Sequence, residues 1–204
     1  DVFENGAKYR WDNKEVEKEL VIFKASEEGI DKISKPSYGT LSYCLKDDKD
    51  CILLETNNDV ENINPRPGCG FKISFDNIDL SEYNRVKMWV YLDVVGQENI
   101  YVHFYIGNDS DVSKTHTESI YANKWNLLVW EIGDTLRDNV NKMVVTPFLF
   151  GCPPEGLGDV KLYFGDLCVD KVKLDRDYGF DIEDDIAYCH SGYFRNANKH
   201  ALTQ

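Results

Sequence analysis

The sequence predicts an all-β fold, a two-sheet antiparallel β-sandwich of the jelly-roll type. About ten short runs alternate apolar and polar residues with a period of two, the pattern of strands that turn one face to a core. Turn residues separate these runs at the spacing typical of sandwiches, and amphipathic helical periodicity is almost absent. The sequence therefore places most of the chain in strands.

The clearest alternation lies in two neighbouring runs, 84–93 and 99–107. In each run aliphatic residues alternate with aromatic, polar or charged ones, so one face of each strand is expected to pack in the core. The connector contains Gly96 and polar residues, which predicts that the two strands form a hairpin. If they do, their other faces form one surface.

The remaining strands are expected along the whole length of the chain. They are 20–25, 40–46, 51–56, 69–75, 115–121, 124–132, 142–150 and 159–175. The stretch 15–20 is compatible with a short helical turn or a charged loop. Pro147 interrupts one strand, which predicts a sheet edge or a bulge there. The run 124–132 is apolar on both phases, so its pattern does not decide which tryptophan faces the core.

Length and composition limit what the chain can be. Its 204 residues suit one sizeable domain plus a fragment, and we expect a domain at 1–176 followed by an acidic linker and the first strand of another domain at 177–204. A net charge of −13 argues against nucleic acid and disfavours strongly anionic glycans as partners. Apolar runs are too short for a membrane span.

Six cysteines are present, none of them in a CxxC pair. A two-residue turn at Asp47 and Asp48 would place Cys44 directly opposite Cys51, which suits a cross-strand disulfide. Buried free thiols are the alternative. The sequence contains no GxSxG elbow, nucleotide-binding loop or histidine pair at metal-ligand spacing, so no catalytic residue is assigned.

A candidate binding surface comes from the non-aliphatic faces of the two central runs. Its side chains are Trp89, Tyr91, Tyr101, His103 and Tyr105. Each has an apolar body and a polar tip, which suits the C–H patches and hydroxyl groups of sugar rings. The same residues would also suit a sheet face that lies beneath a loop or a neighbouring domain.

Several stretches, in order, resemble the jelly-roll, galactose-binding-like carbohydrate-binding modules of bacterial polysaccharide-degrading enzymes. The stretches are FENG at 3–6, SYGTLSYCLK at 37–46, DLSEYNRVKMWVYLD at 79–93, KWNLLVWEI at 124–132 and CVDKVKL at 168–174. The resemblance covers about residues 3–175. Separately, 186–203 resembles the first strand of the immunoglobulin-like domain that precedes the catalytic domain in cellulase-type enzymes.

The resemblance implies a non-catalytic module that binds a polysaccharide or oligosaccharide. It would stand at the N-terminus of a larger secreted enzyme, a glycoside hydrolase or polysaccharide lyase, located outside the cell, in the periplasm or at the cell surface, and its other partner would be the catalytic domain of the same chain. A structural calcium ion is also implied, with Glu4 and Asp170 as ligands and carbonyl groups near Gly39 completing the shell. Two alternatives remain: a structural spacer without a sugar site, and a jelly-roll lyase or hydrolase.

Overall fold

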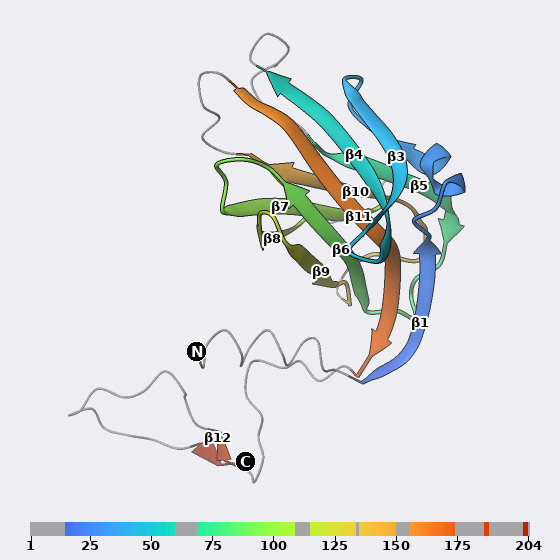
Figure 1. The fold of residues 1–204 in the computed structure, drawn as a ribbon. Coiled ribbons are helices and arrows are strands. Elements are labelled where there is room, and N and C mark those ends of the chain that lie inside the picture. Colours follow the sequence, from blue (N-terminus) through green and yellow to red (C-terminus); the bar gives the residue numbers. More distant parts are fainter. Residues whose placement is uncertain are drawn as a thin grey trace, which may run out of the picture. The chain divides into compact units, whose positions relative to one another are not determined.

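A computed structural model describes residues 15–59, 69–108, 115–133, 135–149 and 156–173, together with 186–187 and 202–203. Two antiparallel sheets pack face to face, as the ribbon in Figure 1 shows. Within the described residues the helical structure is one short 3₁₀ helix, η1 (Glu28–Lys32), and no helix is long and apolar enough to cross a membrane. The predicted two-sheet antiparallel jelly roll is confirmed.

Sheet A has the strand order β3-β4-β11-β6-β9, with β1 paired to β11 as well. Its strands are β1 (Val16–Phe23), β3 (Gly39–Lys46), β4 (Lys49–Asp59), β6 (Arg85–Asp93), β9 (Trp125–Glu131) and β11 (Gly156–Val172). The 17-residue β11 pairs with β4 along its first half and with β1 along its second, while β6 follows its other edge. β11 therefore joins most of this sheet.

Sheet B has the strand order β2-β5-β10-β7-β8. Its strands are β2 (Ile33–Ser34), β5 (Phe71–Ile78), β7 (Asn99–Gly107), β8 (His116–Tyr121) and β10 (Val140–Phe148). In each sheet, alternate residues point to the space between the two layers and the others point outward. Outward positions are therefore where a ligand could reach the strands.

The core lies between the sheets, and it is built from the aliphatic residues that the sequence predicts to face inward from each strand. β6 and β7 contribute Val86, Met88, Val90, Leu92, Ile100, Val102, Phe104 and Ile106, all buried. Phe71 of sheet B stacks on Phe164 of sheet A with 3.8 Å between ring centroids, so aromatic contacts join the layers. Burial of each such side chain contributes about 1.5–3 kcal/mol to the free energy of unfolding.

The predicted hairpin between 84–93 and 99–107 is wrong. β6 pairs with β9 and β11 in sheet A, whereas β7 pairs with β8 and β10 in sheet B, so the connector around Gly96 crosses from one layer to the other. Both strands turn an aliphatic face to the same core, but from opposite sides. Alternation identifies the buried face of a strand and carries no information about which strand lies beside it.

The predicted turn at Asp47 and Asp48 is confirmed. Both residues have positive φ, 52° and 60°, as the tight two-residue hairpin turn requires, and Cys44 lies directly opposite Cys51. Their sulfur atoms are 3.5 Å apart and both cysteines are free thiols.

The fold revises two local expectations and answers one question that the sequence pattern left open. Residues 16–20 belong to β1, so neither a helical turn nor a loop forms there. Pro147 lies in β10, an inner strand of sheet B, at a position where pairing with β5 has already ended at Val145. Its missing N–H therefore costs no ladder bond to β5. Trp130 is the tryptophan of β9 that faces the core.

The sandwich forms one compact unit at 16–172, and residues 1–15 with 173–204 form a second unit. In the second unit, β12 (Ile186–Ala187) pairs with β13 (Leu202–Thr203). The predicted domain limits at 1–176 and 177–204 stay predictions, as does the likeness of 186–203 to an immunoglobulin-like strand. The stretch FENG at 3–6, which contributes to the sequence resemblance, lies outside the described residues.

Candidate functional site

The five predicted binding residues lie on two different faces of the sandwich. Trp89 and Tyr91 point outward from β6 on the outer face of sheet A, and Tyr101, His103 and Tyr105 point outward from β7 on the outer face of sheet B. The core separates the two groups. The expectation that all five form one surface is therefore wrong, because it depended on the hairpin.

The outer face of sheet B carries a strip of rings along β7. Tyr101, with 53% of its surface exposed, lies opposite Phe148 of β10, and the His103 ring packs against Phe148 with 4.1 Å between centroids. Tyr105 lies further along the strand, and its hydroxyl donates a hydrogen bond to the carbonyl oxygen of Asn108 (3.2 Å). From Tyr101 to Tyr105 the strip is about 13 Å long at the usual rise per strand residue.

Other outward side chains of sheet B extend this strip. Thr146 lies opposite His103, and Val144 lies between Tyr105 and Lys72 in register. The ammonium group of Lys142 is 5.9 Å from the centre of the Tyr105 ring. One end of the face is thus aromatic and offers surfaces on which a ligand can stack. The other end has basic groups, which offer hydrogen-bond donors.

Sequence reasoning missed Phe148, which completes the aromatic end of this strip. The signal was present, because Phe148 shares the phase of Val144 and Thr146 in the predicted strand 142–150. What the sequence could not supply was the pairing of β10 with β7, which brings Phe148 beside Tyr101 and His103.

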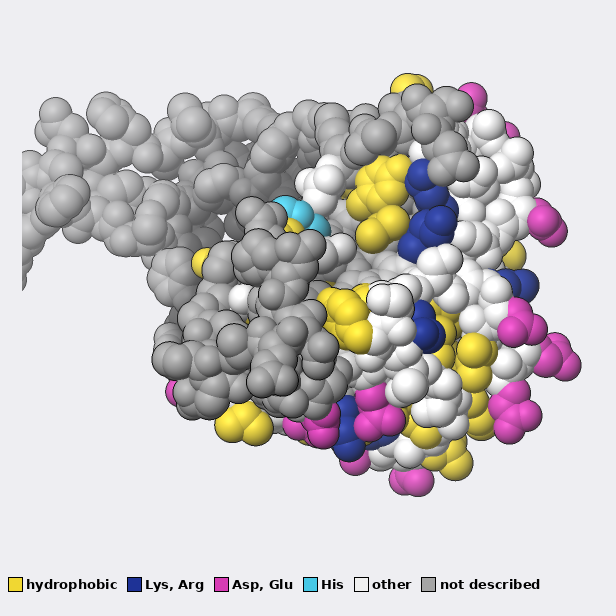
Figure 2. Space-filling model, turned by 90° about the horizontal axis from the view of Figure 1, so that it is seen from above, with side chains coloured by type: hydrophobic (Ala, Val, Ile, Leu, Met, Phe, Trp, Pro, Cys, Tyr) yellow, Lys and Arg dark blue, Asp and Glu magenta, His cyan; other side chains and the backbone are white. Residues whose placement is uncertain are grey.

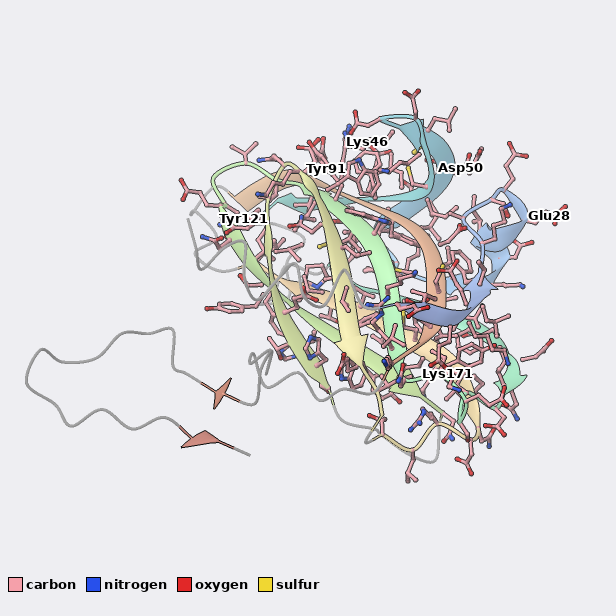
Figure 3. The ribbon with its side chains drawn as sticks, turned by 90° about the horizontal axis from the view of Figure 1, so that it is seen from below. Glu28, Lys46, Asp50, Tyr91, Tyr121 and Lys171 are labelled. Atoms are coloured by element: carbon pink, nitrogen blue, oxygen red, sulfur yellow. The ribbon has the colours of Figure 1, made fainter. Side chains whose placement is uncertain are left out.

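The outer face of sheet A has as many rings, but its own chain covers them. Tyr91 makes edge contacts with Trp125 and Tyr163, at centroid distances of 5.7 and 5.8 Å. The ammonium group of Lys46 lies 4.0 Å from the centre of the Tyr91 ring and 4.7 Å from that of Tyr163. Figure 3 shows Lys46 next to Tyr91. Tyr91 is therefore held in an internal cation–π contact.

The tip of the β3–β4 hairpin fixes a second ring of this face. The indole N–H of Trp125 donates a hydrogen bond to the carboxylate of Asp47 at 3.0 Å. Because Asp47 adjoins Lys46, one tight turn holds both Tyr91 and Trp125. Trp89 differs from its neighbours: 42% of its surface is exposed, with Lys49 5.3 Å from its ring centre.

A charged cluster occupies the other end of the outer face of sheet A. Asp170 is fully buried and accepts two hydrogen bonds from Arg85, at 2.5 and 3.0 Å. The ammonium group of Lys87 lies 3.1 Å from the second carboxylate oxygen, in ion-pair range but without hydrogen-bond geometry, and it also contacts Glu19. Partial burial lowers the pKa of Lys87, but hydrogen bonding and charge attraction to the carboxylates of Glu19 and Asp170 raise it by more. The pKa of Lys87 therefore lies above its ordinary value.

This arrangement does not fit the predicted calcium site at Asp170. The carboxylate already faces two cations, which disfavours a third. Gly39 pairs with Thr56, and Thr56 with Val160, ten positions along β11 from Asp170, so the proposed carbonyl groups lie elsewhere. Glu4 lies outside the described residues, and calcium binding there stays a prediction. Among the residues that the structure describes, no group of three His, Cys, Asp or Glu side chains is placed to hold a metal.

Cys51, Cys69, Cys168 and His116 are in environments that favour their neutral forms. Burial raises the pKa of Cys51 and Cys69 to about 12 and that of Cys168 to about 11, so these thiols are poor nucleophiles at neutral pH. Burial also lowers the pKa of His116, whose ring stacks on Trp130. None of these four residues is among the pairs that β7 and β10 form along the strip on sheet B.

Charge is unevenly spread over the surface. Figure 2 shows a face on which Lys and Arg side chains lie among hydrophobic ones, while most Asp and Glu side chains in that view lie toward its edge. The net charge of −13 therefore does not describe every part of the surface.

Comparison with solved structures finds the same type of fold. The sandwich is similar to part of an exo-β-agarase structure (TM-score 0.53, 9% identity, 75% of this chain and 25% of that chain). It is also similar to a family 30 carbohydrate-binding module of a Clostridium thermocellum cellulosomal cellulase (0.46, 13%, 76% and 98%) and to a family 27 module described as recognising mannan (0.46, 11%, 79% and 99%). No protein-family model matches the sequence, and no curated protein matches it.

Proposed function

We propose that the sandwich is a non-catalytic carbohydrate-binding module that holds a polysaccharide chain against the outer face of sheet B. The observation that carries this proposal is the exposure of Tyr101, 53%, at the aromatic end of a strip that includes His103 and Tyr105. Exposed rings on a rigid sheet offer apolar surfaces to the C–H faces of sugars. Their phenol and imidazole groups, with the nearby lysines, can bond hydroxyl groups.

The strip lies on a sheet face and no deep cleft is needed for binding. Such shallow contacts give modest affinity, so we expect a dissociation constant in the micromolar to millimolar range, roughly −4 to −8 kcal/mol. The overall charge of −13 favours neutral or weakly charged glycans over strongly anionic ones.

The module would act within a larger secreted glycan-degrading enzyme, outside the cell, in the periplasm or at the cell surface. There it would keep a catalytic domain of the same chain near its polysaccharide. Support comes from the ordered sequence resemblance over residues 3–175. The similar solved structures include an exo-β-agarase and a cellulase module.

The test is affinity electrophoresis against a panel of plant and microbial polysaccharides. We expect at least one polysaccharide to retard the parent protein, and Tyr101→Ala to raise the dissociation constant about tenfold, or about 1.4 kcal/mol. Tyr38→Ala is the matched control, because Tyr38 is 45% exposed and lies outside both sheets' central strands. Absence of retardation on every polysaccharide would instead favour the spacer interpretation.

A further inference from the structure

Two cysteine side chains meet across the β3–β4 hairpin. Cys44 of β3 lies directly opposite Cys51 of β4, and their sulfur atoms are 3.5 Å apart. The Cys51 thiol also donates a hydrogen bond to the carbonyl oxygen of Cys44 at 3.4 Å. Cys168 of β11, in contrast, lies opposite Val21 and Lys87 in register. The hairpin therefore brings together two thiols that can react with each other.

The backbone of the hairpin already has the spacing that a disulfide needs. Directly opposite residues of an antiparallel pair have Cα atoms about 4.5–5.5 Å apart, which lies within the range of about 4.4–6.8 Å found across disulfides. The two sulfur atoms, now 3.5 Å apart, have to approach by about 1.5 Å to reach the bond length of about 2.0 Å. Rotation of the two side chains is sufficient for an approach of this size, so the strands can keep their register.

The hairpin is a part of sheet A that gains from a covalent tie. β3 is an end strand of this sheet, and within the described residues it pairs with β4 alone. The turn between the two strands carries Lys46 and Asp47, which hold the rings of Tyr91 and Trp125. Cys44 lies two residues before Lys46. A bond from Cys44 to β4 would therefore fasten both the end strand and the turn that covers these rings.

We propose that Cys44 and Cys51 form a reversible disulfide that fastens the β3–β4 hairpin in an oxidising environment. The oxidant is a small-molecule disulfide such as oxidised glutathione. The Cys44 thiolate attacks one sulfur atom of that molecule, whose S–S bond breaks and releases one thiol. Cys51 then loses its proton to water, and its sulfur attacks the Cys44 sulfur of the mixed disulfide, which releases the second thiol. Overall the two cysteines lose two electrons and two protons, and the small disulfide gains both.

The surroundings of the two thiols decide the order of these steps. Cys44 is half-buried and can meet an oxidant, whereas Cys51 is fully buried. Burial and the hydrogen bond with Cys44 raise the pKa of Cys51 to about 12, so little of this thiol is ionised at neutral pH. Cys51 therefore acts second, when its target sulfur is already held beside it. We expect uncatalysed oxidation to take minutes to hours and to become faster as the pH rises.

The experiment incubates the reduced protein in glutathione buffers that range from reducing to oxidising. Alkylation then blocks the remaining thiols, and mass spectrometry maps the peptides. We expect a peptide pair linked through Cys44 and Cys51, lighter by two hydrogen atoms than the separate peptides. For a loop of this length the oxidised protein should melt about 5 to 10 °C above the reduced one. Cys44→Ala should lose both the linked pair and the difference in melting temperature, whereas the matched control Cys168→Ala should keep both.

The outcomes separate this inference from the proposed function, because the linkage assay needs no glycan. If both cysteines are alkylated at every glutathione ratio, or if either links to a different cysteine, the disulfide is overturned. If the linkage forms without raising the melting temperature, its role in fastening the hairpin is overturned. A protein that forms the stabilising linkage but is retarded by no polysaccharide keeps the disulfide and loses the sheet B proposal.

Discussion

The two outer faces of the sandwich carry similar residues but use them differently. On sheet A, Tyr91, Trp125 and Tyr163 are held by the β3–β4 turn, and Arg85, Lys87 and Asp170 are tied together at the other end. On sheet B, the His103 ring packs against Phe148, Tyr105 donates a hydrogen bond to Asn108, and 53% of the Tyr101 surface faces solvent. Composition alone would rank the two faces equally as binding surfaces.

The difference shows that a ring-rich sheet face has to be judged by what its own chain places on it. An ammonium group over a ring occupies the same surface that a sugar would use. On sheet A, Lys46 and Asp47 hold Tyr91, Tyr163 and Trp125 in contacts within the chain, whereas on sheet B 53% of the Tyr101 surface faces solvent. This contrast predicts separate effects on stability and on binding.

The largest expected effect is on the stability of sheet A. Asp170→Ala would leave the guanidinium of Arg85 buried without its carboxylate, and loss of one partner of a buried pair costs about 3–5 kcal/mol. For a domain of this size that lowers the melting temperature by about 6 to 20 °C, measurable by calorimetry. Glycan binding by the folded protein should not change.

The matched control for Asp170 is an exposed ion pair in the same sheet region. Glu82→Gln breaks the contact between Lys18 and Glu82, both of which are solvent-exposed, and should barely alter the melting temperature. If Asp170→Ala is as mild as this control, the view that sheet A depends on its buried charge cluster is wrong.

A smaller effect is expected at the hairpin tip. Lys46→Met keeps most of the aliphatic stem but removes the ammonium group from Tyr91 and Tyr163, so it should lower the free energy of unfolding by about 0.5–2 kcal/mol. Urea denaturation measures this change. Retardation through the sheet B face should stay at the parent level, and a loss of binding in this variant would remove the distinction between the two faces.

Much of the fold was predictable because strand alternation is a local property. The buried phase of β6 and β7 and the turn at Asp47 and Asp48 follow from neighbouring residues. The assignment of strands to sheets did not follow, since Gly96 is equally compatible with a hairpin and with a crossing between layers. This error alone merged two faces into one predicted site.

The residues that decide the accessibility of each face are distant in sequence. Lys46 reaches Tyr91 and Tyr163 only because β3, β4, β11 and β6 pair side by side in this order. Phe148 joins Tyr101 only through the pairing of β10 with β7. No periodicity reports such contacts. Sequence could thus identify Tyr101, His103 and Tyr105 as surface-directed rings, but not which rings stay uncovered.

The smallest expected effect concerns His116, on the inner side of sheet B, where β8 pairs with β7 opposite the buried Phe104. Burial lowers the pKa of His116 in the folded protein below its ordinary value of 6.5, and the nearest carboxylate, Glu118, is 3.9 Å away and accepts a hydrogen bond from the backbone of Val129. The unfolded chain therefore takes up this proton more readily than the folded one. Stability from the neutral ring is fully present above about pH 6.5 and falls as the pH drops through the folded-state pKa.

His116→Phe keeps a ring on Trp130 but cannot titrate, so its melting temperature should fall less than that of the parent between pH 8 and pH 5. The comparison at pH 8, where His116 is neutral in both states, isolates the packing change. Equal slopes for both proteins would show that His116 adds nothing to the acid sensitivity of this edge.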